Sequence, residues 1–65
     1  MNLSRSMYEN LIDEWIFNER DRAIMKRRIL DGITFEKLAE EFEMSVTGMK
    51  GVVKRNNLIL QSHLD

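Results

Sequence analysis

The sequence predicts an all-α domain of four helices, and three observations lead to that prediction. The chain of 65 residues contains no proline and only three glycines, so little in it interrupts helical backbone. Apolar residues recur at intervals of three and four, which is the helical period. Ser, Asn or Thr, which favour helix N-caps, precedes each amphipathic segment. We therefore treat residues 1–65 as one small domain.

The first helix is expected to begin at Ser4 or Ser6 and to run to about Phe17. Ser6 and Glu9 have the spacing of a capping box, in which each side chain bonds the backbone N–H of the other residue. One side of this helix is apolar and contains Tyr8, Leu11, Ile12 and Trp15.

The second helix is expected to begin after an Asn18 cap and to end at Gly32, because glycine adopts the left-handed conformation that terminates helices. Lys26 and Arg27 interrupt its apolar face, which predicts a helix that is only partly buried. Thr34 then caps a third helix of about eight residues. Its inward side is expected to contain Phe35, Leu38, Ala39 and Phe42.

Ser45 is the expected cap of the fourth helix, which spans residues 46–60. Its apolar stripe consists of Val46, Met49, Val52 and Val53. Residues 61–65 are expected to fray, as chain ends commonly do.

Composition argues against several classes of protein. A chain of this length buries only about 60% of the surface that its unfolded form exposes, which leaves little room for a catalytic cleft. Without cysteine it has neither a disulfide scaffold nor a thiolate zinc site. His63 is the one histidine and lies in the expected tail. We therefore expect no enzyme, no cofactor and no metal.

No apolar run approaches the roughly 20 residues that cross a bilayer, and acidic residues interrupt the N-terminal segment where a signal peptide would be apolar. We expect a soluble cytoplasmic protein without a membrane partner. The initial Met and the absence of a tag-like segment suggest a complete small protein.

The charges are unevenly distributed although the net charge is only −1. Residues 22–28 contain four cations and no acid, and residues 45–64 contain three cations and no acid. An acidic segment, residues 36–43, separates these two basic ones. The distribution favours one or two cationic surfaces over a uniformly charged one.

Residues 34–56 have the pattern of a helix-turn-helix. Such a unit needs a small residue where its helices cross, supplied by Ala39, and an apolar residue in the turn, supplied by Met44. Its second helix needs small, polar and basic side chains. Those side chains are Ser45, Thr47, Lys50, Lys54 and Arg55, of which residues 47, 50 and 54 share one helical face and can enter one groove.

The stretch from residue 17 to residue 56 resembles region four of bacterial sigma factors and related small phage and mobile-element regulators. The residues that carry the resemblance are Arg22, Ile24, Arg28, Gly32, Thr34, Glu36, Leu38, Ala39, Glu40 and Ser45, with Met49 at a position that is usually Val and Lys50 after it. The resemblance implies sequence-directed binding of double-stranded DNA in transcription regulation, with helix 46–60 in the major groove. For some members it also implies contact with RNA polymerase.

This chain departs from the pattern at several positions. Glu43 stands where the turn commonly has Gly, so we expect either a strained left-handed turn or a looser one. Arg27 stands where a core Leu is usual. Gly48 and Gly51 lie inside the fourth helix, where they either loosen its first turn or allow its backbone to approach DNA closely.

The cations of the second helix allow two interpretations. Arg22, Lys26 and Arg27 either bind backbone phosphate or form a solvated face that pairs with Glu36, Glu40 and Glu41. The solvated face is slightly favoured. Arg28 is the exception that we assign to DNA binding.

A second function class is a protein-interaction module of the same fold, which binds RNA polymerase or another protein without DNA contact. Tyr8, Trp15 and Phe17 either form a binding ridge or fill the core against the fourth helix, and the core is favoured. Adjacent Leu58, Ile59 and Leu60, with Leu64, either fold back onto the first helix or form the seam of a homodimer.

Overall fold

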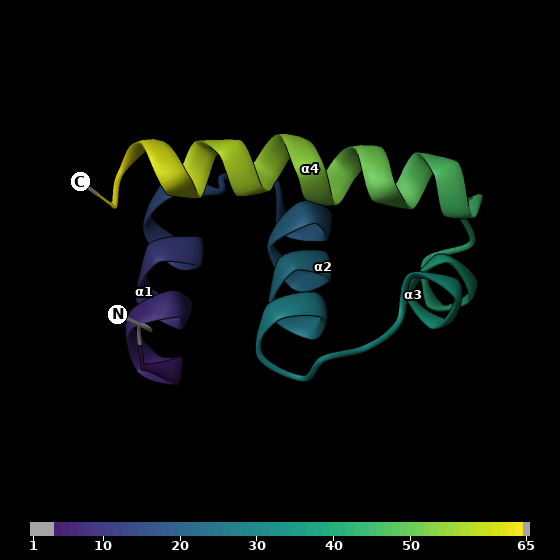
Figure 1. The fold of residues 1–65 in the computed structure, drawn as a ribbon, viewed down its shortest axis with the longest axis horizontal. Coiled ribbons are helices and arrows are strands. Elements are labelled where there is room, and N and C mark those ends of the chain that lie inside the picture. Colours follow the sequence, from purple (N-terminus) through teal and green to yellow (C-terminus); the bar gives the residue numbers. More distant parts are fainter. Residues whose placement is uncertain (1–3, 65) are drawn as a thin grey trace.

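The computed structural model describes residues 4–64, which contain four α-helices and no strand. Helices α1 (Arg5–Trp15) and α2 (Glu19–Ile29) stand side by side, and α4 (Val46–Ser62) runs across one end of both (Figure 1). The short α3 (Phe35–Glu41) packs against the N-terminal part of α4. The predicted all-α, four-helix fold is confirmed.

All four helices begin at a predicted cap, which for α1 is Ser4, the first of the two expected positions. The Asn18 side chain accepts a hydrogen bond from the backbone N–H of the third residue beyond it at 3.0 Å, and Thr34 does the same at 3.2 Å. Ser45 accepts from the N–H of Gly48 at 3.0 Å. These local bonds satisfy N–H groups that lack a partner within the helix.

The predicted capping box of Ser6 and Glu9 is wrong, because α1 begins at the earlier cap, Ser4. This start places Arg5 in the first turn. Its guanidinium donates to the carbonyl of Leu30 at 2.7 Å and to a carboxylate oxygen of Asp31 at 3.0 Å. The earlier start of α1 thus comes with a tertiary contact between Arg5 and the end of α2.

The ends of α1 and α4 also differ from the prediction. Helix α1 ends at Trp15, and the extended backbone of Ile16 places that side chain in the core. Helix α4 continues to Ser62, and the ring of His63 stacks on Trp15 with 3.6 Å between ring centroids. The expected fraying is therefore wrong for residues 61–63, because packing on α1 holds them. Asp65 lies outside the described residues.

Two left-handed residues end α2 and α3. Gly32 has a φ of +68° after α2, as predicted. After α3 the left-handed residue is Glu43, with a φ of 55°. The Met44 N–H donates to the Ala39 carbonyl at 2.8 Å, which closes this turn. Of the two expected turns the tight one is observed, at a cost of about 1–2 kcal/mol for a residue with a Cβ.

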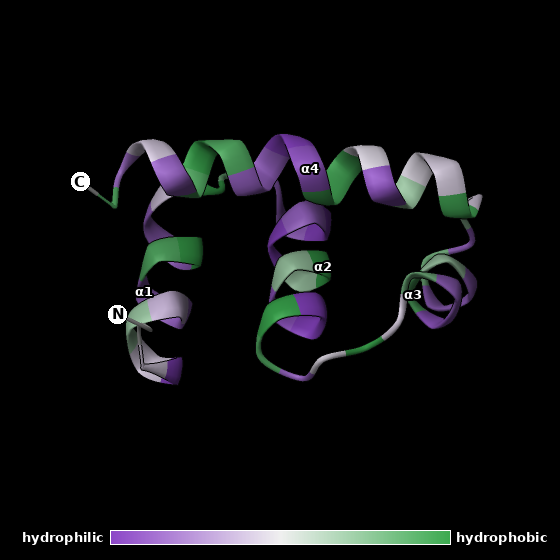
Figure 2. Cartoon of the chain, in the orientation of Figure 1, coloured by the Kyte–Doolittle hydropathy of each residue, from purple (hydrophilic) through white to green (hydrophobic). Residues whose placement is uncertain are grey.

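The core lies where α4 crosses the other helices. Its largest fully buried side chains come from α1, the residue after α1, and the other three helices, and they are Ile12, Ile16, Ile24, Met25, Leu38, Met49 and Leu60. Met44 and Phe42 are half-buried against this cluster. In Figure 2 the middle of α4 is hydrophilic and the segment after it is hydrophobic, so polar and apolar stretches succeed one another along the same helix.

Candidate functional site

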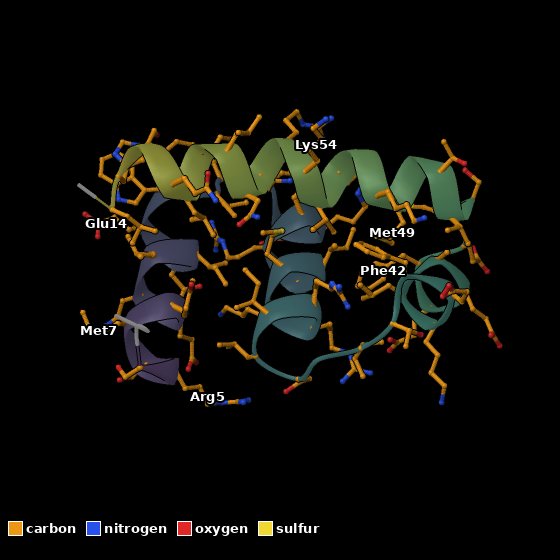
Figure 3. All side chains as sticks on the ribbon, in the orientation of Figure 1. Arg5, Met7, Glu14, Phe42, Met49 and Lys54 are labelled. Carbon is orange, nitrogen blue, oxygen red and sulfur yellow. The ribbon has the colours of Figure 1, made fainter. Side chains whose placement is uncertain are left out.

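The outward side of α4 is the first part of the candidate site. The inward side contains the buried residues Met49, Val52, Val53, Asn56 and Leu60. Thr47, Lys50 and Lys54 lie on the opposite side and are exposed, where their spacing places them. Lys54 points away from the helices on which α4 lies (Figure 3). Ser45 is exposed at the N-terminus of the helix, with its hydroxyl engaged as the cap.

The two lysines of this outward side have no acidic partner in the part of the chain that the structure describes. Neither Lys50 nor Lys54 forms an ion pair there, and residues 46–64 contain no Asp or Glu. Because α4 places them on its solvent side, their charges face water. This surface can attract an anion without first breaking an internal ion pair.

Arg55 differs from the two lysines because it is held by α2. Its guanidinium lies 3.4 Å from an Asp21 carboxylate oxygen, and the Asn56 amide donates to the same oxygen at 3.1 Å. The other carboxylate oxygen accepts from Arg20 at 3.1 Å. Asp21 is 6% exposed and Asn56 is 3% exposed, so this pair is buried between α2 and α4, whereas the side chains of both arginines are more than half exposed.

The network sets the protonation of Asp21. Burial raises the pKa of its carboxyl, but hydrogen bonds from Asn56 and Arg20, and the nearby positive charge, lower it by more. The resulting pKa lies below the ordinary value of 3.8. Neither Asp21 nor Asn56 was predicted as a site residue. The sequence signal for Asn56 was a polar residue at a position of the apolar stripe of α4.

Arg28 is half-buried at the junction of α2 and α3. Its guanidinium donates to the Ile33 carbonyl at 2.9 Å and lies over the Phe35 ring, 4.2 Å from the ring centroid. The Lys50 ammonium is 5.8 Å from the same centroid. The fold therefore brings Arg28 and Lys50, predicted separately as site residues, to one aromatic ring that the sequence analysis assigned only to the core.

The remaining α2 cations are used within the protein. Arg22 donates to the Ile16 carbonyl at 2.9 Å, and the Lys26 ammonium lies 2.8 Å from an Asp13 carboxylate oxygen. Arg27 pairs with Glu41 at 2.8 Å. The predicted pairing with α3 thus holds for Glu41, whereas the other partners come from α1 and its neighbouring loop, because α2 packs against both.

Arg27 belongs to a chain of charges at the end of α2. It also pairs with Asp31 at 3.2 Å, and Asp31 in turn pairs with Arg5. Hydrogen bonds from Arg5 and then Arg27 lower the pKa of the Asp31 carboxyl, and Glu41 and Asp31 raise the pKa of Arg27. Arg27 is thereby bonded to two carboxylates, one of them shared with Arg5, so it is poorly placed to bind an external phosphate.

The two glycines of α4 have different surroundings. A Cβ on Gly48 would lie 3.1 Å from the Ser45 hydroxyl oxygen, so the missing side chain leaves room for the cap. A Cβ on Gly51 would meet nothing within 4 Å. Helix α4 is continuous through both residues. Gly51 lies beside Thr47 and Lys54 on the exposed side and leaves a gap there.

The aromatic and C-terminal apolar side chains divide between core and surface. Trp15 and Tyr8 are half-buried, but Phe17 is 77% exposed, so its expected place in the core is wrong. The reason is that the chain leaves α1 at Ile16, which takes the buried position instead. Leu60 folds inward, whereas Leu58 and Ile59 are 60% and 37% exposed.

Other kinds of site find little support in residues 4–64. A groove beside the C-terminal end of α4 is lined by Met7, Asn10, Leu11, His63 and Leu64 and carries no acid or base pair for chemistry. The described residues contain no group of three side chains that could hold a metal ion. None of the described helices combines the length and apolar character that crossing a membrane requires.

Comparison with known protein families, curated proteins and solved structures gives no match to this chain.

Proposed function

We propose that residues 34–56 act as a helix-turn-helix that binds duplex DNA in a small sigma-region-four-like transcription regulator, with α4 in the major groove. The observation that carries the proposal is the cationic outward side of α4. Lys50 and Lys54 are exposed without an acidic partner among the described residues, whereas the neighbouring arginine Arg27 is doubly paired. A surface of uncompensated cations on one helix is what a polyanion contacts.

The arrangement suggests a role for each site residue. Thr47 is near the start of α4, where side chains of a recognition helix reach base edges. Lys50 and Lys54 contact bases or phosphates farther along the same face. Arg55 is turned toward α2 by Asp21 and holds the rim of the duplex. The Ser45 hydroxyl retains its own O–H for a phosphate oxygen.

Helix α3 and the turn after it support this placement of α4. Met44 packs against the core from the turn, and Ala39 is buried where α3 meets its neighbours. The tight turn at Glu43 fixes the direction in which α4 leaves α3. A rigid connection matters because base readout requires the second helix to be held at one angle to the backbone.

A fluorescence-anisotropy titration with a labelled random duplex tests the proposal. Binding is expected at about 50 mM salt and is expected to weaken steeply by about 200 mM, because bound cations release counterions from DNA. The pair Lys50→Gln with Lys54→Gln is expected to weaken binding by about 10- to 100-fold. The charge-matched control is Lys26→Gln with Lys37→Gln on α2 and α3, which is expected to weaken it by less than about threefold.

Two results oppose DNA binding by α4. One is no binding of any duplex at low salt. The other is equal loss in both double variants, which would indicate a general charge effect and not a contact surface.

The proposed partners include a second protein as well as DNA. A single module of this size covers roughly 600–1,000 Å² of DNA, which supports only modest affinity. We therefore include in the proposal either a homodimer on two half-sites or a complex with RNA polymerase. Sedimentation of the protein with and without a duplex distinguishes one copy from two per DNA.

The second candidate function is protein binding without DNA contact, and the exposed apolar side chains Phe17, Leu58 and Ile59 favour it. Exposed apolar groups of this size commonly belong to interfaces when they adjoin one another. Titration of purified RNA polymerase with the wild type and with a Phe17→Ser, Leu58→Ser variant tests this function. Polymerase binding that the variant abolishes, in a protein that binds no duplex, would favour the second candidate.

A further inference from the structure

Three helices bring cationic and aromatic groups together at Phe35. This residue begins α3 and is half-buried. The Arg28 guanidinium from α2 lies 4.2 Å from the ring centroid, and the Lys50 ammonium from α4 lies 5.8 Å from it. Both distances are within the range of a cation–π contact, so one ring is in contact with two positive groups.

The orientation of Arg28 leaves most of its donors available. A guanidinium is planar, and its five N–H groups point outward from its edge. The central carbon of the guanidinium lies 4.2 Å from the Phe35 centroid, and the bond to the Ile33 carbonyl at 2.9 Å uses one of its N–H groups. No other hydrogen bond to this guanidinium occurs among residues 4–64. The plane is therefore fixed while several donors remain unfilled.

The charge at this place is uncompensated within the described chain. Arg27, one residue earlier, bonds to both Asp31 and Glu41. Neither Arg28 nor Lys50 has a carboxylate within ion-pair distance in that part of the chain, although α3 carries several glutamates. Two like charges that share a ring and lack an acid are suited to an anion that has several oxygens.

We propose that Arg28, Phe35 and Lys50 form a binding site for one phosphate group. Arg28 donates from its fixed plane, Lys50 adds a second positive charge, and Phe35 positions both cations without contacting the oxygens itself. The assignment of that phosphate to the DNA backbone beside α4 rests on the proposed function. The site then links the start of α3 to the duplex and sets the angle at which α4 enters the groove.

Titration with inorganic phosphate in the absence of DNA tests the site directly. In NMR spectra the Arg28 Nε–H signal and the Phe35 ring signals are expected to shift and to saturate. The Arg22 Nε–H signal is the internal control, because that group is already bonded to Ile16. Arg28→Gln and Lys50→Gln are each expected to abolish the saturable shift of the ring. A linear shift, or an equal shift at Arg22, overturns the site.

A double-mutant cycle on duplex binding tests the assignment to DNA. Arg28→Gln and Lys50→Gln are each expected to weaken binding several-fold, and the double variant is expected to weaken it by less than the product of the two effects. That non-additivity follows because both side chains serve one phosphate. Lys26→Gln is the charge-matched control on α2, since Lys26 faces Asp13 of α1. A fully multiplicative double variant overturns the shared phosphate on DNA.

Phe35→Leu tests the role of the ring, because leucine keeps an apolar side chain but removes the aromatic face. The coupling between Arg28 and Lys50 is expected to disappear in this background. Circular dichroism checks the fold, and if Phe35→Leu unfolds the protein, the cycle in the wild-type background still decides. If the wild type binds no duplex but phosphate saturates the site, only the proposed DNA function fails. If the wild type binds duplex DNA but phosphate does not saturate the site, only the inferred phosphate site fails.

Discussion

The cations of α2 and those of α4 belong to helices that pack together, yet their surroundings are opposite. On α2, Arg27 is bonded to two carboxylates and Lys26 to one, and Arg22 is bonded to a carbonyl. On α4, Lys50 and Lys54 have no acidic partner among residues 4–64. In the α2 segment two of the four cations, Lys26 and Arg27, are thus paired with carboxylates, whereas neither lysine of α4 is paired within those residues.

A count of charges along the sequence therefore does not locate a binding surface. The α2 segment has the denser cluster in the sequence, four cations within seven residues, but two of them are paired with carboxylates and the other two each donate to a backbone carbonyl. Arg28 lies on α2, but its side chain contacts the same Phe35 ring as Lys50 of α4. Arg55 is the converse case, an α4 cation that α2 binds through Asp21.

The largest expected effect on stability comes from Asp21→Ala, which breaks the link between the two helices. The change leaves the buried Asn56 amide without its carboxylate partner and releases Arg55 and Arg20. A loss of about 1–3 kcal/mol in the free energy of unfolding is expected, because an unsatisfied buried donor retains its desolvation cost. Urea denaturation measures it. A loss no larger than that of a surface change such as Glu9→Ala would contradict the role of the network.

Acid is expected to lower the free energy of unfolding by less than Asp21→Ala does. Asp21 and Asp31 have folded-state pKa values below 3.8. Their ionised forms are therefore bound more strongly in the folded protein, and the stability that they supply is complete above about pH 4 and is lost as pH falls through the folded-state pKa values. Unfolding curves between pH 7 and pH 2 measure the effect. The Asp21→Asn variant is expected to lose less stability over that window than the wild type, and an equal loss would exclude Asp21 as a cause.

Gly51→Ala tests whether the backbone of α4 approaches DNA closely on its exposed side. The added methyl group meets no atom within 4 Å, so the helix is expected to gain up to about 1 kcal/mol of stability. Affinity for duplex DNA is nevertheless expected to fall if the backbone of α4 approaches the groove closely. Gly48→Ala is the matched control, because its methyl group lies 3.1 Å from the Ser45 cap and should offset the helical gain. A Gly51→Ala protein that is stabler and binds equally well would exclude close approach at this position.

The smallest expected effects come from Arg27, which is paired with carboxylates, and Lys54, which is not paired in the described part of the chain. Arg27→Gln removes exposed ion pairs and is expected to change stability by less than about 1 kcal/mol. The salt dependence of duplex binding should stay the same in this variant. Lys54→Gln should reduce the magnitude of the slope of log K against log salt by about 0.9, the value for one phosphate contact. Equal slopes for the two variants would remove the contrast between α2 and α4.

Much of the fold could be predicted because helix formation depends on neighbouring residues. The caps at Asn18, Thr34 and Ser45 and the terminator Gly32 act within four residues of the chain. The exposed side of α4 also follows from spacing along one helix. The errors lie at helix ends: the capping box at the start of α1, Phe17 after its end, and His63 at the end of α4. At those ends packing between distant segments outweighs local preference.

The candidate site could be predicted only in part for the same reason. Lys50 and Lys54 were identified from helical spacing, and both are exposed. The contact of Lys50 with Phe35 was missed, because an aromatic residue at an inward position of a short helix indicates the core, and nothing nearby in the sequence indicates a cation over its ring. The carboxylate partners of the α2 cations come mostly from other elements.

The sequence by itself determined that this chain forms four helices, where most of them begin, and that its last helix carries positive charge without acid. Those properties depend on contacts within one or two helical turns. Only the tertiary structure decided which cations are neutralised, that Asp21 bonds Asn56 across 35 residues of chain, and that Arg28 and Lys50 meet at Phe35. Ion pairs and cation–π contacts require separations of a few ångströms, and between helices those separations are set by packing.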